Sequence, residues 1–163
     1  MKTMKTMRTA VKSPGRLKQA LLAECLRIQQ CKADNARQAM LDVQESANEH
    51  QGSIEDKFES FREACHIQRE LFAHQLEEAE RGLAVLQRLR DAHVLAGVPG
   101  LGSVVETDVH TYFISVSIGE FTVDGQPYCA ISAFSPLFLA MANHRAGDTF
   151  QFRGRSYHIK AVY

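Results

Sequence analysis

Acidic side chains gather around a short break in the helical pattern of the N-terminal half of the chain. The carboxylates are those of Asp42, Glu45, Glu49, Glu55, Asp56 and Glu59. Lys57 is the only Lys or Arg in this segment. Such a group can bind a divalent cation, act as a base or present negative charge to a partner. The break at Gln51-Gly52-Ser53 separates two helical stretches of similar length, so an antiparallel hairpin would carry these carboxylates at its far end. The sequence therefore predicts a long hairpin with an acidic tip.

The same residues also have a purely structural interpretation. A run of charge on a helix is commonly only its solvated face, which suits Asp42, Glu45 and Glu63. Ser53 can be the N-cap of the second helix with Asp56 three residues later in a capping-box-like role, and Glu55 would favourably meet the helix dipole. For Asp56 and Glu59 both interpretations stay open.

Two long helices are predicted on either side of the break. The first begins with Ser13-Pro14, a cap and a first-turn proline, and continues with Leu17, Leu21, Cys25 and Ile28 at helical spacing. Apolar residues of the second fall on heptad positions: Phe58, Phe61, Cys65, Phe72, Ala79, Leu86 and Leu89. Gln68 and Gln75 fall on the same seam and are expected to weaken its middle. At roughly 35 to 40 residues each, helices of about 50 to 60 Å bury their apolar stripes most simply on one another.

Beyond Gly97-Val98-Pro99-Gly100 the apolar period changes to two, which indicates strands. We expect one strand that begins at Val104, a second from Tyr112 to Ile118 and a third at 128–131. Two further strands, 149–152 and 157–162, are expected to form a closing hairpin. A short helix from Leu137 to Ala142 follows the cap Ser135 and the proline Pro136. The predicted fold class is α+β: a basic, disordered leader (1–12), a coiled-coil hairpin (13–96), a linker (97–102) and a small antiparallel β domain with one short helix (103–163).

Composition excludes several classes of function. The 163 residues hold 19 basic and 19 acidic side chains, a balance that argues against a general binder of nucleic acid or anionic membranes. The leader has no apolar run, so we expect neither a signal peptide nor a membrane anchor. The four cysteines form no Cys-x-x-Cys pair, which favours free thiols in a reducing cytoplasm and leaves no zinc spacing. The sequence contains neither a phosphate-binding glycine loop nor a Gly-x-Ser-x-Gly motif, so it gives no sign of the enzyme classes that use them.

The C-terminal part contains a series of short motifs: Ile131-Ser132, Ser135-Pro136-Leu137, Ala140 and Gly147-Asp148, followed by a last strand that ends near Val162. These motifs are similar to the FKBP-like domain of the Gre-type transcript-cleavage factors, which the chain resembles over nearly all of its ordered length. The segment from Gly52 to Glu59 is similar to the family's hairpin tip. The resemblance implies a cytoplasmic bacterial protein, monomeric and not itself an enzyme. An FKBP-like fold does not by itself imply prolyl isomerase activity.

The resemblance also implies partners. The C-terminal domain would dock on the rim of the RNA polymerase secondary channel, and the hairpin would enter the channel and come near the 3′ end of the nascent RNA. In the family, two tip carboxylates help to hold the second Mg²⁺ of the polymerase, and the factor has no metal or cofactor of its own. A two-metal site stabilises the attacking and leaving oxygens together.

The tip departs from the family's pattern at one position. Aligned on Gly52, the family's first tip Asp falls on Ser53 and its Glu on Asp56. A serine hydroxyl is a poor substitute for a carboxylate on Mg²⁺, although Glu49 or Glu55 could compensate. The tip residues expected to act on the polymerase Mg²⁺ are Asp56, Glu59, Glu55 and Ser53. We hypothesise that the protein stimulates cleavage weakly or not at all, and that it regulates elongation, pausing or initiation by occupying the channel.

Docking is expected around the short helix, at Ser135, Pro136, Leu137, Phe138 and Met141. Phe134, Phe138 and Met141 cluster there, either as core residues or as an apolar surface for a helical hairpin of the partner. A coiled-coil adaptor or holdase chaperone unrelated to transcription is the alternative class. Its weakness is that a clamp is expected to present apolar residues where this chain presents acids.

Overall fold

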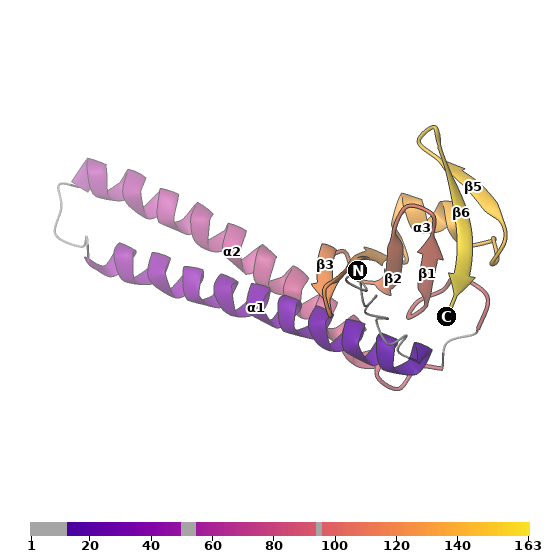
Figure 1. Ribbon diagram of the computed structural model, residues 1–163. Coiled ribbons are helices and arrows are strands. Elements are labelled where there is room, and N and C mark those ends of the chain that lie inside the picture. The colour runs from indigo at the N-terminus through magenta and orange to yellow at the C-terminus, as the bar shows by residue number, and fades with distance from the viewer. Residues whose placement is uncertain (1–12, 50–54, 94–95) are drawn as a thin grey trace, which may run out of the picture.

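Two long helices form an antiparallel hairpin, as the heptad pattern predicts. The computed structural model describes residues 13–49, 55–93 and 96–163, with side chains from residue 57 onward in the second helix. Helix α1 spans Pro14–Glu49 with 36 residues, and α2 spans Glu55–Leu89 with 35. The two lie side by side, and the end where α1 stops and α2 starts is remote from the rest of the molecule (Figure 1). The predicted leader and the turn at 50–54 lie outside the described residues.

Small side chains hold the helices close along their seam. Ala33, Ala36 and Ala79 are buried there, and the amide of Gln29 donates to the Ala79 carbonyl at 3.3 Å. A Cβ on Gly82 would stand 2.4 Å from Gln29 Nε2, so glycine provides the room for this amide.

The prediction that Gln68 and Gln75 occupy the seam was wrong. Both side chains are exposed, and the buried polar residue between the helices is Gln29, which is 8% exposed. The other row of the heptad does stay at the seam, since Cys65, Ala79 and Leu86, which are spaced by multiples of seven residues, are buried.

The C-terminal part forms one six-stranded sheet in the order β3-β4-β2-β1-β6-β5. In chain order the elements are β1 Val104–Thr107, β2 Thr111–Ser115, β3 Gly119–Val123, β4 Gln126–Ser132, α3 Pro136–Met141, β5 Thr149–Phe152 and β6 Arg155–Val162. Two-residue turns at Asp124-Gly125 and Arg153-Gly154 have positive φ throughout, which matches the twist of the hairpins that they close. The predicted α+β class, a long helical hairpin with a small β domain and one short helix, is confirmed.

Two details of the strand prediction were wrong. The alternation from Tyr112 to Ile118 covers the end of β2 and a loop, and Gly119, with a φ of 88°, starts a separate strand. The sheet is also mixed, because β2 pairs in parallel with β4 from Tyr112–Cys129 to Ser115–Ser132. A period of two predicts strands without specifying their neighbours, so this pairing could not be read from it.

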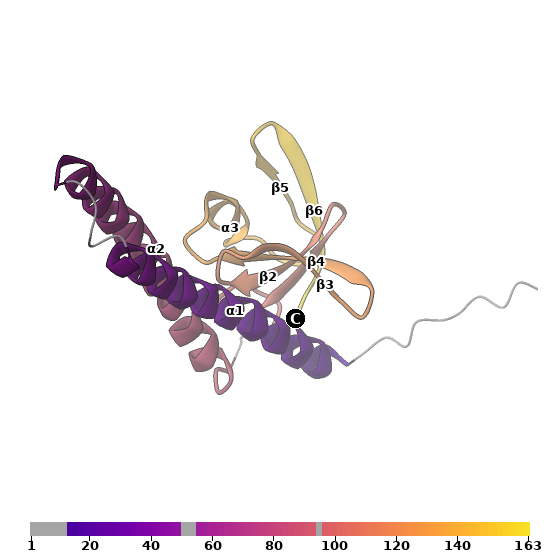
Figure 2. The ribbon, with the colours of Figure 1, turned by 90° about the vertical axis from the view of Figure 1, so that its left-hand side faces the viewer.

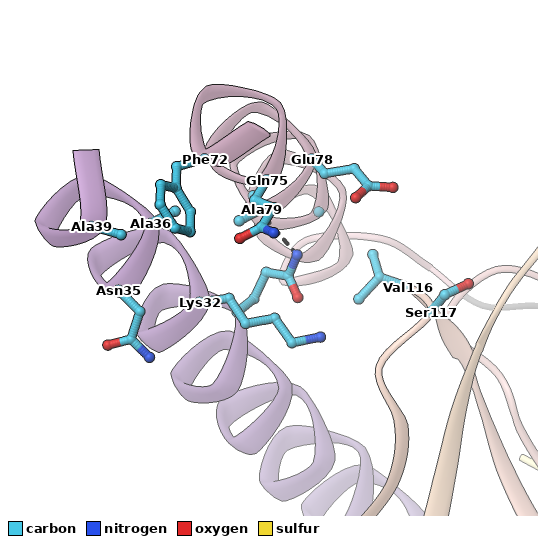
Figure 3. A pocket seen from close by; sticks show the side chains of 12 residues that line it. Lys32, Asn35, Ala36, Ala39, Phe72, Gln75, Glu78, Ala79, Val116 and Ser117 are labelled. Atoms are coloured by element: carbon cyan, nitrogen blue, oxygen red, sulfur yellow. Dashed lines mark hydrogen bonds between the residues drawn. The ribbon is translucent and has the colours of Figure 1, made fainter. Parts of the chain in front are cut away.

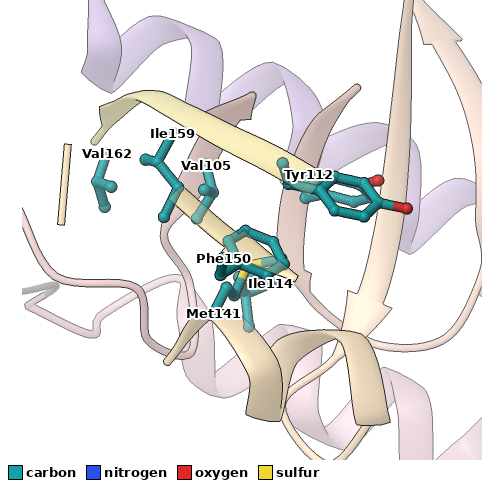
Figure 4. Packing of buried hydrophobic residues seen from close by; sticks show 8 residues of the cluster. Val105, Tyr112, Ile114, Met141, Phe150, Ile159 and Val162 are labelled. Atoms are coloured by element: carbon teal, nitrogen blue, oxygen red, sulfur yellow. The ribbon is translucent and has the colours of Figure 1, made fainter. Parts of the chain in front are cut away.

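Each face of the sheet carries a cluster of buried apolar residues. On one face, a cluster that includes Val105, Ile114 and Ile159 packs with Met141 of α3 and with Phe150 of β5 (Figure 4). Val104 and Phe113 belong to a second cluster, and because neighbouring residues of a strand point to opposite faces, this cluster lies on the other face.

The second cluster joins the sheet to the hairpin. Leu21 and Cys25 of α1 and Leu86 of α2 are fully buried and pack with Val104 and Phe113. The base of the hairpin therefore shares a hydrophobic core with the β domain, and the two helices extend away from it (Figure 2). Packing at this junction sets the direction in which the hairpin points.

Burial of Cys25 makes the stability of this junction depend on pH. Loss of solvation raises the pKa of its thiol from 9.0 to about 12. The neutral, buried thiol therefore contributes its full share of the folding stability below the pKa of the unfolded chain, 9.0, and this share is lost as pH rises from 9.0 toward 12. Burial likewise raises the pKa of Tyr112 to about 12, which acts in the same direction.

We expect the free energy of unfolding to fall above about pH 9, by up to about 1.4 kcal/mol per pH unit for each such group. Urea titrations at several pH values measure how steeply the free energy of unfolding falls with pH. In Cys25→Ala this fall should be less steep than in the wild type. The matched control is Cys31→Ala, because Cys31 is exposed on the same helix. Equal slopes for the two variants would contradict the assignment to Cys25.

Within the described residues, neither long helix nor the short one has the length and apolarity needed to cross a membrane.

Candidate functional site

The described tip carboxylates lie at the end of the hairpin that is remote from the sheet. Glu49 is the last residue of α1, Glu59 lies in the second turn of α2, and both side chains are exposed. Glu55 and Asp56 belong to the first turn of α2, but their side chains are outside the described part, as is Ser53 altogether. The fold therefore brings the ends of both helices together at an acidic tip. That Asp56, Glu59, Glu55 and Ser53 act on the polymerase Mg²⁺ stays a prediction.

Basic and polar side chains follow directly behind the tip. The Arg62 guanidinium lies 5.6 Å from the centroid of the Phe58 ring, and both residues line a shallow pocket with Gln44 and Asn48. The cation and the ring hold each other in place there. Basic and polar side chains therefore accompany the carboxylates close to the tip.

The acidic residues farther from the tip fit the solvated-face interpretation. Asp42, Glu45 and Glu63 are exposed, and Asp42 accepts a hydrogen bond of 2.9 Å from Gln38 one turn earlier. Contacts of this kind support the helix itself.

A resident metal site has no ligand set in the part of the chain that the structure describes. There, no three His, Cys, Asp or Glu side chains are placed to hold a metal ion. Exposed carboxylates at a tip can instead complete the shell of an ion held by another protein, since Mg²⁺ commonly keeps one or two carboxylates beside ligands from water and substrate.

The predicted docking residues divide between core and surface. Ser135 caps α3 by accepting from the Phe138 amide at 3.2 Å, and Pro136 is the exposed first residue of the helix. Leu137 and Phe138 are half-buried against the sheet cluster. Met141 is fully buried, so its side chain cannot contact a partner while the domain is folded.

Two large apolar side chains beside these residues are exposed instead. Phe134 is 90% exposed at the turn before α3, and Leu139 is 63% exposed on the helix. Leu139 was absent from the predicted docking set. Its position follows from helical spacing, because Phe138 and Met141 at i and i+3 face the sheet and Leu139 therefore points off that face. Large apolar side chains that are this exposed are available to a partner protein.

The fold and the site together define a class: a protein with an acidic helical probe anchored to a small β domain that has an exposed apolar surface. No protein-family model and no curated protein sequence matches the chain. Among solved structures, the chain is similar to GreA factor homolog 1 (Gfh1) of Thermus thermophilus, with 20% identity and a TM-score of 0.35 over 87% of this chain and 92% of that one. A second structure, of the transcription factor Gfh1, shows 20% identity and a TM-score of 0.33 over 85% and 92%. With TM-scores this low, neither similarity by itself supports a function.

Proposed function

We propose that this chain is a Gre-like factor that binds bacterial RNA polymerase with its β domain and extends its acidic hairpin tip into the secondary channel. The observation that carries the proposal is the placement of Glu49 and Glu59 at the end of a hairpin whose opposite end is built into the core of the β domain. Helices of 35 and 36 residues extend about 50 Å. A rigid probe of that length can place charge in a narrow passage.

The chemistry at the tip is electrostatic. Carboxylates near the polymerase active centre would add oxygen ligands to its second Mg²⁺, which would then activate a water for hydrolysis of the backtracked RNA. The factor would approach the RNA 3′ end without a base-specific contact, in keeping with its net charge of zero. It would act in the cytoplasm and contribute no catalytic centre of its own.

Ser53 in place of a carboxylate favours a weak or silent cleavage factor. A hydroxyl contributes no negative charge to a hard cation, so the tip would bind Mg²⁺ less tightly than two carboxylates would. The protein would then act chiefly by occupying the channel. A coiled-coil adaptor without any role in transcription remains the alternative class.

RNA release from a defined backtracked elongation complex of the cognate polymerase tests the proposal. If the tip supports cleavage, we expect Asp56→Ala and Glu59→Ala to lower the rate by about 10- to 100-fold, because each change removes a carboxylate oxygen that would help to hold the second Mg²⁺. Glu63→Ala is the matched control, because Glu63 is exposed one turn farther along the same helix.

Absence of cleavage has two meanings that a second assay separates. Competition with a known channel-binding factor for the polymerase would identify a regulator that occupies the channel. Neither cleavage nor competition, together with no co-purification of polymerase subunits, would contradict the proposal and favour the adaptor class.

A further inference from the structure

A pocket of about 630 Å³ lies where the hairpin meets the sheet, well away from the acidic tip. It is lined by residues of α1, of α2 and of the loop after β2, where Val116 and Ser117 lie (Figure 3). Its size is within the usual range for pockets that bind small molecules. The proposed polymerase function uses none of its residues.

One wall of the pocket is apolar. Phe72 lies between the helices beside Ala36 and Ala39, and Ala79 completes the surface (Figure 3). A flat ring or a branched side chain of a ligand would bury its surface against the Phe72 ring and these small residues.

A buried polar atom without a partner points to a ligand that donates a hydrogen bond. Gln29 lines the pocket and is 8% exposed, and its Nε2 donates to the Ala79 carbonyl. Its Oε1 is buried and has no hydrogen-bond partner among the described residues. Leaving such an acceptor unsatisfied is costly, and a donor group on a ligand would relieve that cost.

Opposite charges flank the opening. Lys32 extends from α1 and Glu78 from α2, both toward the side where Val116 and Ser117 lie (Figure 3). Of the ion pairs formed among described residues, none includes either side chain. A ligand that carries both a carboxylate and an ammonium would pair with both.

We propose that this pocket binds a free amino acid with a large, ring-containing side chain. The ligand's carboxylate pairs with Lys32, its ammonium pairs with Glu78, and its ring packs against Phe72. A ring N–H, as in tryptophan, donates to Gln29 Oε1. The site belongs to the junction of hairpin and sheet, so its existence does not depend on any role in transcription.

The test is titration of the full-length protein with L-tryptophan, followed by amide NMR and calorimetry. We expect saturable binding that shifts the amide signals of Phe72 and Ser117, and about 10-fold weaker binding by Lys32→Met and by Glu78→Gln. Both side chains are exposed, so these variants should fold as the wild type does. Lys160→Met, an exposed lysine on β6, is the matched control and should bind normally.

The ring N–H has its own control. Wild type should bind tryptophan about 5-fold more tightly than phenylalanine, and Gln29→Leu should abolish that preference. No saturable binding of tryptophan up to about 5 mM would overturn the proposal. Unchanged affinity in both charge variants, or binding of uncharged indole as tight as that of tryptophan, would overturn it as well.

Discussion

If the β domain docks on RNA polymerase as proposed, Phe134→Asp should lower the affinity for the polymerase by about 100-fold and leave the melting temperature nearly unchanged. With 90% of its surface exposed, Phe134 contributes little to the folded domain and is available to a partner. A large aromatic residue at an interface is a typical energetic anchor, and a loss of about 3 kcal/mol corresponds to that change in affinity. Binding of fluorescently labelled protein to purified polymerase measures the effect.

Two matched variants separate docking from folding. Ile67→Asp changes a side chain that is 61% exposed on α2 and should alter neither affinity nor stability. Met141→Asp places a charge in the sheet cluster and should unfold the domain. Normal polymerase binding by a folded Phe134→Asp variant would show that this surface is not the docking site. Leu139→Asp provides an independent measurement at the other exposed apolar side chain of this region.

Leu86→Ala should destabilise the whole protein, by about 3 to 5 kcal/mol. Leu86 is fully buried where α2 meets α1 and the sheet, so its removal leaves a cavity in the core that the hairpin and the β domain share. Such Leu→Ala changes in cores cost about 2 to 5 kcal/mol, and a site bounded by three elements has little freedom to collapse. Urea unfolding followed by circular dichroism measures the change.

Leu71→Ala is the control for this prediction, because Leu71 lies on the same helix and is 55% exposed. Its cost should be below about 1 kcal/mol. If helical signal and β-domain fluorescence were lost in two separate transitions in the wild type, the shared core would not couple the two parts. The junction would then not fix the direction of the hairpin.

Local patterns carried most of the fold prediction. Pro14 after Ser13 marks the start of α1, and Ser135-Pro136 marks the start of α3, because a cap and a first-turn proline act on adjacent residues. Cys25 and Cys65, at apolar positions of the pattern, are buried as expected. The parallel pairing of β2 with β4 was missed because it joins segments that no local pattern relates.

The candidate site shows the same division. The acidic end of the hairpin could be read from the position of the break, since two helices of similar length must bring Glu49 and Glu59 to one end. The exposed face of α3 could not be read in this way, because whether Phe138, Leu139 or Met141 faces solvent depends on where the sheet lies against α3. Met141 was therefore placed in the docking set although it is fully buried.

The order of the main parts follows from the sequence alone: two long helices, a break rich in acids and a β domain with one short helix. These follow from the apolar period and from caps and turns, which act over a few residues. Other features emerge only in the folded protein: Leu21 and Leu86 join the hairpin to the sheet, Gln29 is buried beside Gly82, and Phe134 and Leu139 are left exposed. Burial depends on contacts between residues far apart in the chain, and a pattern read along one segment does not contain them.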